Sequence, residues 1–246
     1  MRVFKNLFVS YFHDPSMFAT IIISCLLFIA FLLLLLVTLS VPIIKTIYLF
    51  TLTASVSSSL ESASSSVKFG VWGYCISGVD VSGIFSDSVI APECSKAHLG
   101  YTIDSTVASA LNLDSNKLVH VVSETTTAAL VLHPIACGLT FLTLLVSLFM
   151  LRRGSNGTVR LPSLITLGVG ILATLFTTII FLIDVIVVAV VRNGVKDGTN
   201  GVVTLNWGNA VWMALGATLA LWLAMVGTCG GVCACGARYR RNTEKF

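Results

Sequence analysis

Residues 17–39 read MFATIIISCLLFIAFLLLLLVTL and contain no charged side chain. A helix rises about 1.5 Å per residue, so a run of this length can cross a hydrocarbon core of about 30 Å. Three later apolar runs are also long enough to cross it, at 128–151, 164–191 and 210–228. The whole chain is 56% hydrophobic and 11% charged, a balance that soluble domains do not show. The sequence therefore predicts a membrane all-α fold, a bundle of four transmembrane helices.

The distribution of Lys and Arg predicts how these helices are oriented. If the N-terminus is cytosolic, the segments 1–16, 152–163 and 229–246 hold nine of the fifteen basic residues. Because basic residues concentrate on the cytosolic side, we expect both termini in the cytosol. The loops 40–127 and 192–209 are then external. The sequon at Asn156 falls in the cytosolic turn and should stay unmodified.

Cysteine positions agree with that orientation. Cys75 and Cys94 are the only cysteines of the loop 40–127, where the compartment is oxidising. A bridge between them would constrain the unfolded loop by roughly 3 kcal/mol. Two further cysteines, Cys25 and Cys137, lie inside apolar runs and are interpreted as small buried residues.

A third group of cysteines stands at the inner end of the fourth span. Cys229, Cys233 and Cys235 are followed by a basic tail, and this arrangement suits S-palmitoylation beside anionic lipid. Unmodified thiols are the alternative. Their spacing does not match a zinc knuckle, and we expect no metal and no cofactor.

The amino-acid composition of the loop 40–127 changes along its length. The Ser-rich stretch 51–66 is interpreted as a weakly amphipathic helix or a flexible connector. Aromatic and β-branched residues across 67–85 predict a small hairpin, tied by the disulfide to the segment ending at Cys94. Asp104 and Asp114 stand where two short helices would begin. In the second loop, Asn-Gly and Asp-Gly pairs predict turns, and residues 202–205 could add one edge strand.

Polar and small residues within the spans are arranged on faces. On the fourth span they recur every four residues, which favours close helix packing at Gly216, Ala220 and Ala224. Similar faces on the second and third spans are expected to meet in the bundle.

Asp184 is an intramembrane carboxyl and a functional candidate by position. The alternative is a carboxyl hydrogen-bonded within the bundle. His98, His120 and His133 are placed outside or at the outer interface, where they could titrate with ambient acidity. More simply, His133-Pro134 begins the second span.

Several motifs together carry a family resemblance. Phe69 to Cys75 reads FGVWGYC, a second cysteine follows at Cys94, and later come LGY and HPIA motifs. This pattern resembles the fungal PalI family and its eisosome-associated relatives, and its Gly-x-Trp-x-x-Cys is similar to the claudin superfamily. The motif residues outside the disulfide are Gly70, Trp72, Gly73, Tyr74, Leu99, Gly100, Tyr101, His133 and Pro134. The fold implied is claudin-like, with a disulfide-stapled extracellular sheet.

The resemblance implies a plasma-membrane protein that is an accessory to a surface receptor for ambient pH. The alternative is a structural organiser of cortical membrane domains or cell contacts. Expected partners are membrane lipids and either a receptor or further copies of the chain. We interpret Trp72 and the disulfide as structural, with Trp72 packed against the bridge, and a partner-binding surface is the alternative.

Other classes of function have little support. No nucleophile elbow, phosphate loop or carboxylate pair is present, so we do not expect an enzyme. Basic residues form no continuous patch with aromatics, which argues against nucleic acid. A channel or transporter would depend on Asp184 and the polar faces alone.

Overall fold

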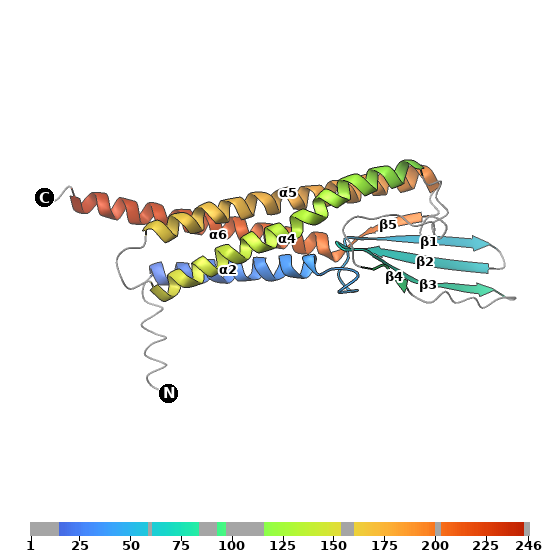
Figure 1. Ribbon diagram of the computed structural model, residues 1–246, viewed down its shortest axis with the longest axis horizontal. Coiled ribbons are helices and arrows are strands. Elements are labelled where there is room, and N and C mark those ends of the chain that lie inside the picture. The colour runs from blue at the N-terminus through green and yellow to red at the C-terminus, as the bar shows by residue number, and fades with distance from the viewer. Residues whose placement is uncertain are drawn as a thin grey trace, which may run out of the picture. The chain divides into compact units, whose positions relative to one another are not determined.

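The computed structural model describes residues 15–58, 61–83, 93–96, 116–153, 160–199 and 203–243. Four helices dominate it: α2 (Pro15–Thr38), α4 (Asn116–Arg153), α5 (Arg160–Thr199) and α6 (Asn209–Thr243) (Figure 1). Each contains a stretch long and apolar enough to span a membrane, at Thr20–Thr38, Val131–Phe149, Ile165–Asn193 and Asn209–Gly230. The predicted four-helix membrane bundle is confirmed.

Five strands form one antiparallel sheet in the order β4-β3-β2-β1-β5. Their bounds are β1 Phe50–Ser58, β2 Glu61–Phe69, β3 Tyr74–Gly83, β4 Glu93–Cys94 and β5 Val203–Trp207. Strand β5 comes from the loop between the third and fourth spans and pairs with β1 at the edge of the sheet. The predicted edge strand is therefore confirmed.

The chain divides into two compact units, which we name by their contents. The helical unit contains Met1–Leu33, Ala136–Thr178 and Gly216–Phe246. The sheet unit contains Leu34–Ile135 and Ile179–Leu215, so it holds the strands and the helix ends that pack on them.

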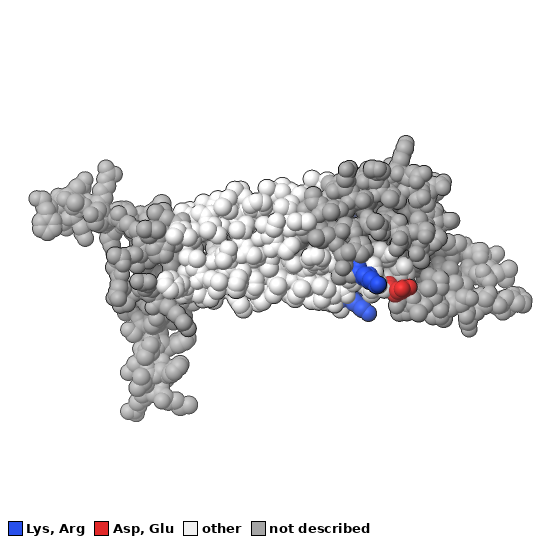
Figure 2. All heavy atoms as spheres, viewed as in Figure 1, with Lys and Arg blue, Asp and Glu red and all other residues white. Residues whose placement is uncertain are grey.

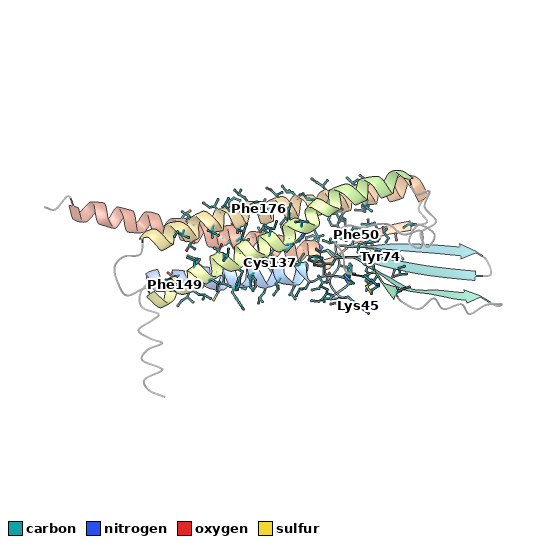
Figure 3. The ribbon with its side chains drawn as sticks, in the orientation of Figure 1. Lys45, Phe50, Tyr74, Cys137, Phe149 and Phe176 are labelled. Atoms are coloured by element: carbon teal, nitrogen blue, oxygen red, sulfur yellow. A yellow bond between two sulfur atoms is a disulfide. The ribbon has the colours of Figure 1, made fainter. Side chains whose placement is uncertain are left out.

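One face of the sheet forms the core of the sheet unit. Strand alternation brings Phe50 opposite Phe69 and Leu52 opposite Val67, and all four are buried. The rings of Phe50 and Phe69 stack with centroids 4.8 Å apart, and Phe50 is labelled in Figure 3 with Tyr74 from the same face. Helix residues complete this core, among them Val37, Val188, Val191 and Val211. The helix ends therefore cover the apolar face of the sheet.

The helical unit is uncharged wherever its side chains are described, and large apolar side chains such as Leu223 and Val226 lie exposed on it. Figure 2 shows the described helical surface in view as a white band free of Lys, Arg, Asp and Glu. Such a surface suits a hydrocarbon solvent and would be costly in water.

The predicted hairpin is confirmed: it is formed by β2 and β3, with its turn at 70–73. Two other sequence predictions about local structure are wrong. The stretch 51–66 is neither helix nor connector but most of β1 and β2. In α5 the helix continues through Asn193-Gly194 and Asp197-Gly198 to Thr199, where turns were expected.

Helix α4 and the end of α6 also differ from expectation. A separate short helix beginning at Asp114 is not seen; instead α4 starts at Asn116 and runs unbroken into the second span. The Cys- and Arg-containing segment after 228 is helical up to Thr243, because α6 continues through it. Asp104, Asp114 and Asn156 lie outside the described residues.

Close backbone contact at Gly208 generates a prediction. A Cβ there would lie 2.5 Å from the carbonyl carbon of Leu49, whereas a Cβ at Gly138 would meet nothing within 4 Å. We expect Gly208→Ala to lower the melting temperature of the purified chain in detergent. The matched Gly138→Ala change should leave it unchanged or raise it, because Ala is favoured over Gly inside a helix by about 0.5–1 kcal/mol. Equal effects of the two changes would contradict the close packing at Gly208.

Candidate functional site

The turn between β2 and β3 is held against the end of the first span. Gly70 N–H donates to the Gly73 carbonyl at 2.9 Å, which closes the turn. A Cβ on Gly70 would overlap the backbone of Val41, whereas one on Gly73 would overlap Ser95 Oγ and lie 3.3 Å from Cδ of Pro42. Gly70 is therefore required by close approach of the segment that follows α2, and Gly73 mainly by the Ser95 side chain.

Trp72 connects this turn to α2. Its indole Nε1–H donates to the Thr38 carbonyl at 2.5 Å, and Val71 N–H donates to Ser40 Oγ at 2.8 Å. Thr38 is the last residue of α2, so its carbonyl has no partner within the helix. The indole supplies that partner. Sequence reasoning placed Trp72 beside the disulfide and missed this cap, which only the three-dimensional arrangement reveals.

The predicted disulfide is confirmed. Cys75 of β3 and Cys94 of β4 are directly opposite in the strand register, with a Cα–Cα distance of 4.0 Å. Around it, Ser95 N–H donates to the Tyr74 carbonyl at 2.9 Å, and Tyr74 N–H donates to Ser95 Oγ at 3.0 Å. A two-residue strand is too short to be stable alone, so the covalent bond is what holds β4 to the sheet.

Asp184 and His133 meet inside the sheet unit. His133 Nε2 lies 3.3 Å from Asp184 Oδ2, and the side chains are only 1% and 4% exposed. This is the one ion pair among the described residues. Asp184 was predicted as a functional carboxyl, or alternatively as one hydrogen-bonded within the bundle, and its contact with His133 of α4 fits the alternative. The sequence signal that could have indicated this contact is the position of His133, which has apolar residues on both sides.

The position of His133 differs in part from expectation. It does not begin a helix, because α4 begins at Asn116 and Pro134 stands inside it. It does lie at the start of the second apolar stretch, Val131–Phe149, as predicted. Proline in a helix interior has no N–H to donate to the carbonyl four residues earlier. The two motif residues therefore mark an interior point of α4 where the helix is locally weakened and a side chain reaches across to α5.

Hydroxyl groups line the interior of the helical unit. Ser24 of α2 and Ser147 of α4 share a hydrogen bond of 2.7 Å. Most buried threonines bond to a carbonyl of their own helix, for instance Thr140 to Ala136 and Thr177 to Ala173. Such bonds satisfy the hydroxyls locally and permit close packing without charge. The second and third spans present these residues on the faces predicted from sequence.

The residues of α6 that were predicted to pack closely lie on the inner face of the helix. Ala220 and Ala224 are buried, and a Cβ on Gly216 would lie 3.4 Å from Leu33 Cδ1. Trp212, from the same four-residue series, is 65% exposed. Because a helix has 3.6 residues per turn, a strict spacing of four drifts off the packed face.

Other predicted residues are only partly described. Leu99, Gly100, Tyr101 and His98 lie outside the described residues, and the side chain of His120 is not described. Cys229 is exposed, while Cys233 and Cys235 lie on α6 with side chains that are not described. Cys137 is buried as expected, but Cys25 is exposed, so its prediction is wrong. An apolar run with nothing but lipid beside it does not bury every small residue.

The described residues offer little reactive chemistry. No group of three or more His, Cys, Asp or Glu among them could hold a metal ion. What they offer instead is a stapled sheet, a helix cap and one buried acid–base pair.

A four-span bundle with a disulfide-stapled antiparallel sheet, built from the segments that follow its first and third spans, is a claudin-like membrane protein. The family model described as SUR7/PalI family matches residues 19–224, and the chain belongs to that family. A comparison with curated proteins found no match.

The disulfide yields a testable prediction. Replacing Cys75 by Ser should release β4 and lower the amount of protein that leaves the secretory pathway, while the four helices still insert. The double change at Cys75 and Cys94 should be no worse than either single change, because each single change already loses the constraint of roughly 3 kcal/mol. Surface labelling measures this, and wild-type surface levels of the single variant would contradict it.

The buried pair of His133 and Asp184 yields a second testable prediction. Asp184→Leu alone leaves His133 facing an apolar side chain, and we expect it to destabilise the chain by about 3–5 kcal/mol. Combining it with His133→Leu should recover much of that loss, because two apolar side chains pack without a desolvation cost. Denaturation of the single and double variants in detergent measures the coupling. Additive effects would show that the two side chains do not act as a pair.

Proposed function

We propose that the chain is a non-enzymatic plasma-membrane protein and an accessory to a surface receptor that responds to ambient pH. Membership of the SUR7/PalI family supports this, since the PalI motifs carried the expectation of such a role. The observation that carries the proposal further is the anchored sheet. It offers a folded surface for a partner, held by the Cys75–Cys94 disulfide and by the contact of Trp72 with α2.

The disulfide supports an orientation with both termini in the cytosol. Disulfides persist in oxidising compartments, so the Cys75–Cys94 bond argues for an external sheet. The density of Lys and Arg gives the same orientation independently. On this view, the sheet is the part that a receptor or an external signal would meet.

Deleting the gene and growing cells at alkaline pH tests the accessory role. We expect poor growth and weak activation of the pH response, with the receptor depleted from the cell surface. Re-expression of the wild-type chain should restore all three. Normal growth with full activation in the deletion strain would contradict the proposal.

A structural organiser of cortical membrane domains is the second candidate. Its support is the claudin-like fold together with exposed apolar side chains of α6, including Trp212 and Leu223, which could contact lipid or another copy. A fluorescently tagged chain separates the two roles. Stable cortical patches that persist without the receptor would favour the organiser.

We propose further that Cys229, Cys233 and Cys235 are S-palmitoylated. Cys229 is exposed, and the same helix continues to Arg238, Arg240 and Arg241, which would lie against an anionic leaflet. Acyl-exchange labelling should detect a hydroxylamine-sensitive signal that disappears when all three become Ser. We expect that variant to keep its abundance and insertion but to disperse from cortical clusters. A wild-type chain without the signal would rule acylation out.

A further inference from the structure

We propose that residues 39–49, which we name the connecting segment, lie in the headgroup layer of the membrane. In this position Ile43 inserts among the lipid chains, and Lys45 binds the phosphate of a phospholipid in the leaflet beside the sheet. The inference concerns how the sheet unit meets lipid, so it goes beyond the accessory role and does not depend on it.

The connecting segment is hydrogen-bonded to two spans at the points where they end. It follows the first span, which ends at Thr38, and Ser40 N–H donates to the Val37 carbonyl of that span at 3.1 Å. Near its other end, Tyr48 accepts a hydrogen bond of 3.1 Å from the N–H of Ala210, in the first turn of the fourth span. Because a span ends where the hydrocarbon core ends, both contacts hold the connecting segment at the membrane boundary.

The apolar core brings the end of the third span to the same level. Two side chains of the connecting segment, Ile47 and Leu49, are buried in the core of the sheet unit. That core also contains one residue from each of the first, third and fourth spans: Val37, Val191 and Val211. The third span ends two residues after Val191. The connecting segment therefore packs against the ends of three spans.

Ile43 is a large apolar side chain that points away from this core. It is 56% exposed, and outside the four span ranges the described residues offer one comparable side chain, Trp207, at 36%. Trp207 stands two residues before the fourth span begins. Water makes such exposure unfavourable for an aliphatic side chain, whereas tryptophan is enriched where a membrane meets water. Contact with lipid explains both exposed side chains.

Cationic side chains lie at the same boundary. Lys45 is exposed two residues after Ile43, and Figure 3 labels it where the chain passes from α2 to the sheet. Arg192 is exposed beside the last residue of the third span. The connecting segment contains no Asp or Glu, and among the described residues no acid forms an ion pair with Lys45. A lysine at this depth can keep its carbon stem in lipid and place its ammonium against a phosphate.

The first test measures whether water reaches position 43. The full-length chain carrying Ile43→Cys is placed in nanodiscs that hold one copy each, so a second chain cannot cover the site. Its reaction with a water-soluble maleimide is followed by mass spectrometry of the peptide with the new thiol. The matched control is Thr204→Cys, at an exposed position of β5 that lies five residues before the fourth span. We expect Ile43→Cys to react many times more slowly, and equal rates would overturn the proposal.

The second test measures the contact with phosphate and needs no new thiol. Melting temperatures are compared in nanodiscs of a zwitterionic phospholipid with and without an added anionic phospholipid. We expect the anionic lipid to raise the melting temperature of the wild type, because Lys45 gains a more strongly charged partner. Lys45→Gln should lose much of that increase. Lys96→Gln removes an exposed lysine of the same unit outside the connecting segment and should keep it.

Three results of the second test would overturn the lipid site. The first is an equal increase in Lys45→Gln and the wild type, and the second is no increase in the wild type. The third is the same increase when inorganic phosphate replaces the anionic lipid, because Lys45 would then belong to a site for a dissolved anion.

Discussion

The structure of the sheet unit depends on the hydrogen bonds made by the backbone groups at the end of α2 and at the start of α6. A helix leaves its last carbonyls and first N–H groups without partners inside the helix. Near a membrane, leaving those groups without a hydrogen bond costs free energy. At the end of α2, Trp72 supplies a donor to the Thr38 carbonyl. At the start of α6, the Ala210 N–H donates to the Tyr48 carbonyl at 3.1 Å, and Asn209 bonds on both sides of residue 47, to Thr46 and Tyr48.

These contacts explain why the sheet follows the first span so closely. Residues 39–49 leave α2, bond to both helix ends, and enter β1 at Phe50. The sheet then turns back at Gly70 to contact Val41, and β5 returns to meet Leu49 through Gly208. Close approach at these two glycines is thus a consequence of satisfying backbone groups, and the stacked Phe50 and Phe69 fill the space that remains.

Much of the fold could be predicted from sequence, because the strongest signals were long apolar runs and a pair of cysteines in one loop. The strands of 50–66 were missed because both β1 and β2 are rich in serine, and a Ser-rich stretch resembles a linker when only composition is considered. Turn signals failed in α5, where the helix passes through two Asx-Gly pairs.

The candidate site was predicted only in part, for a related reason. Asp184 was visible as a carboxyl in an apolar run, but its partner lies 51 residues away in sequence on another helix. His133 was assigned to a helix start because proline is common there, whereas this proline sits in the middle of α4. Pairings between helices depend on rotation and register, which the sequence of one chain does not specify.

The central claim is that the indole of Trp72 ties the sheet to the first span, and one comparison tests it directly. Trp72→Phe keeps an aromatic ring and removes the donor, and Trp222→Phe does the same to an indole that bonds to Thr178 in the helical unit. The measurement is the temperature at which Cys75 and Cys94 become accessible to a reductant in the purified chain. We predict a clear decrease for Trp72→Phe and none for Trp222→Phe. Equal temperatures for the two variants would contradict this account.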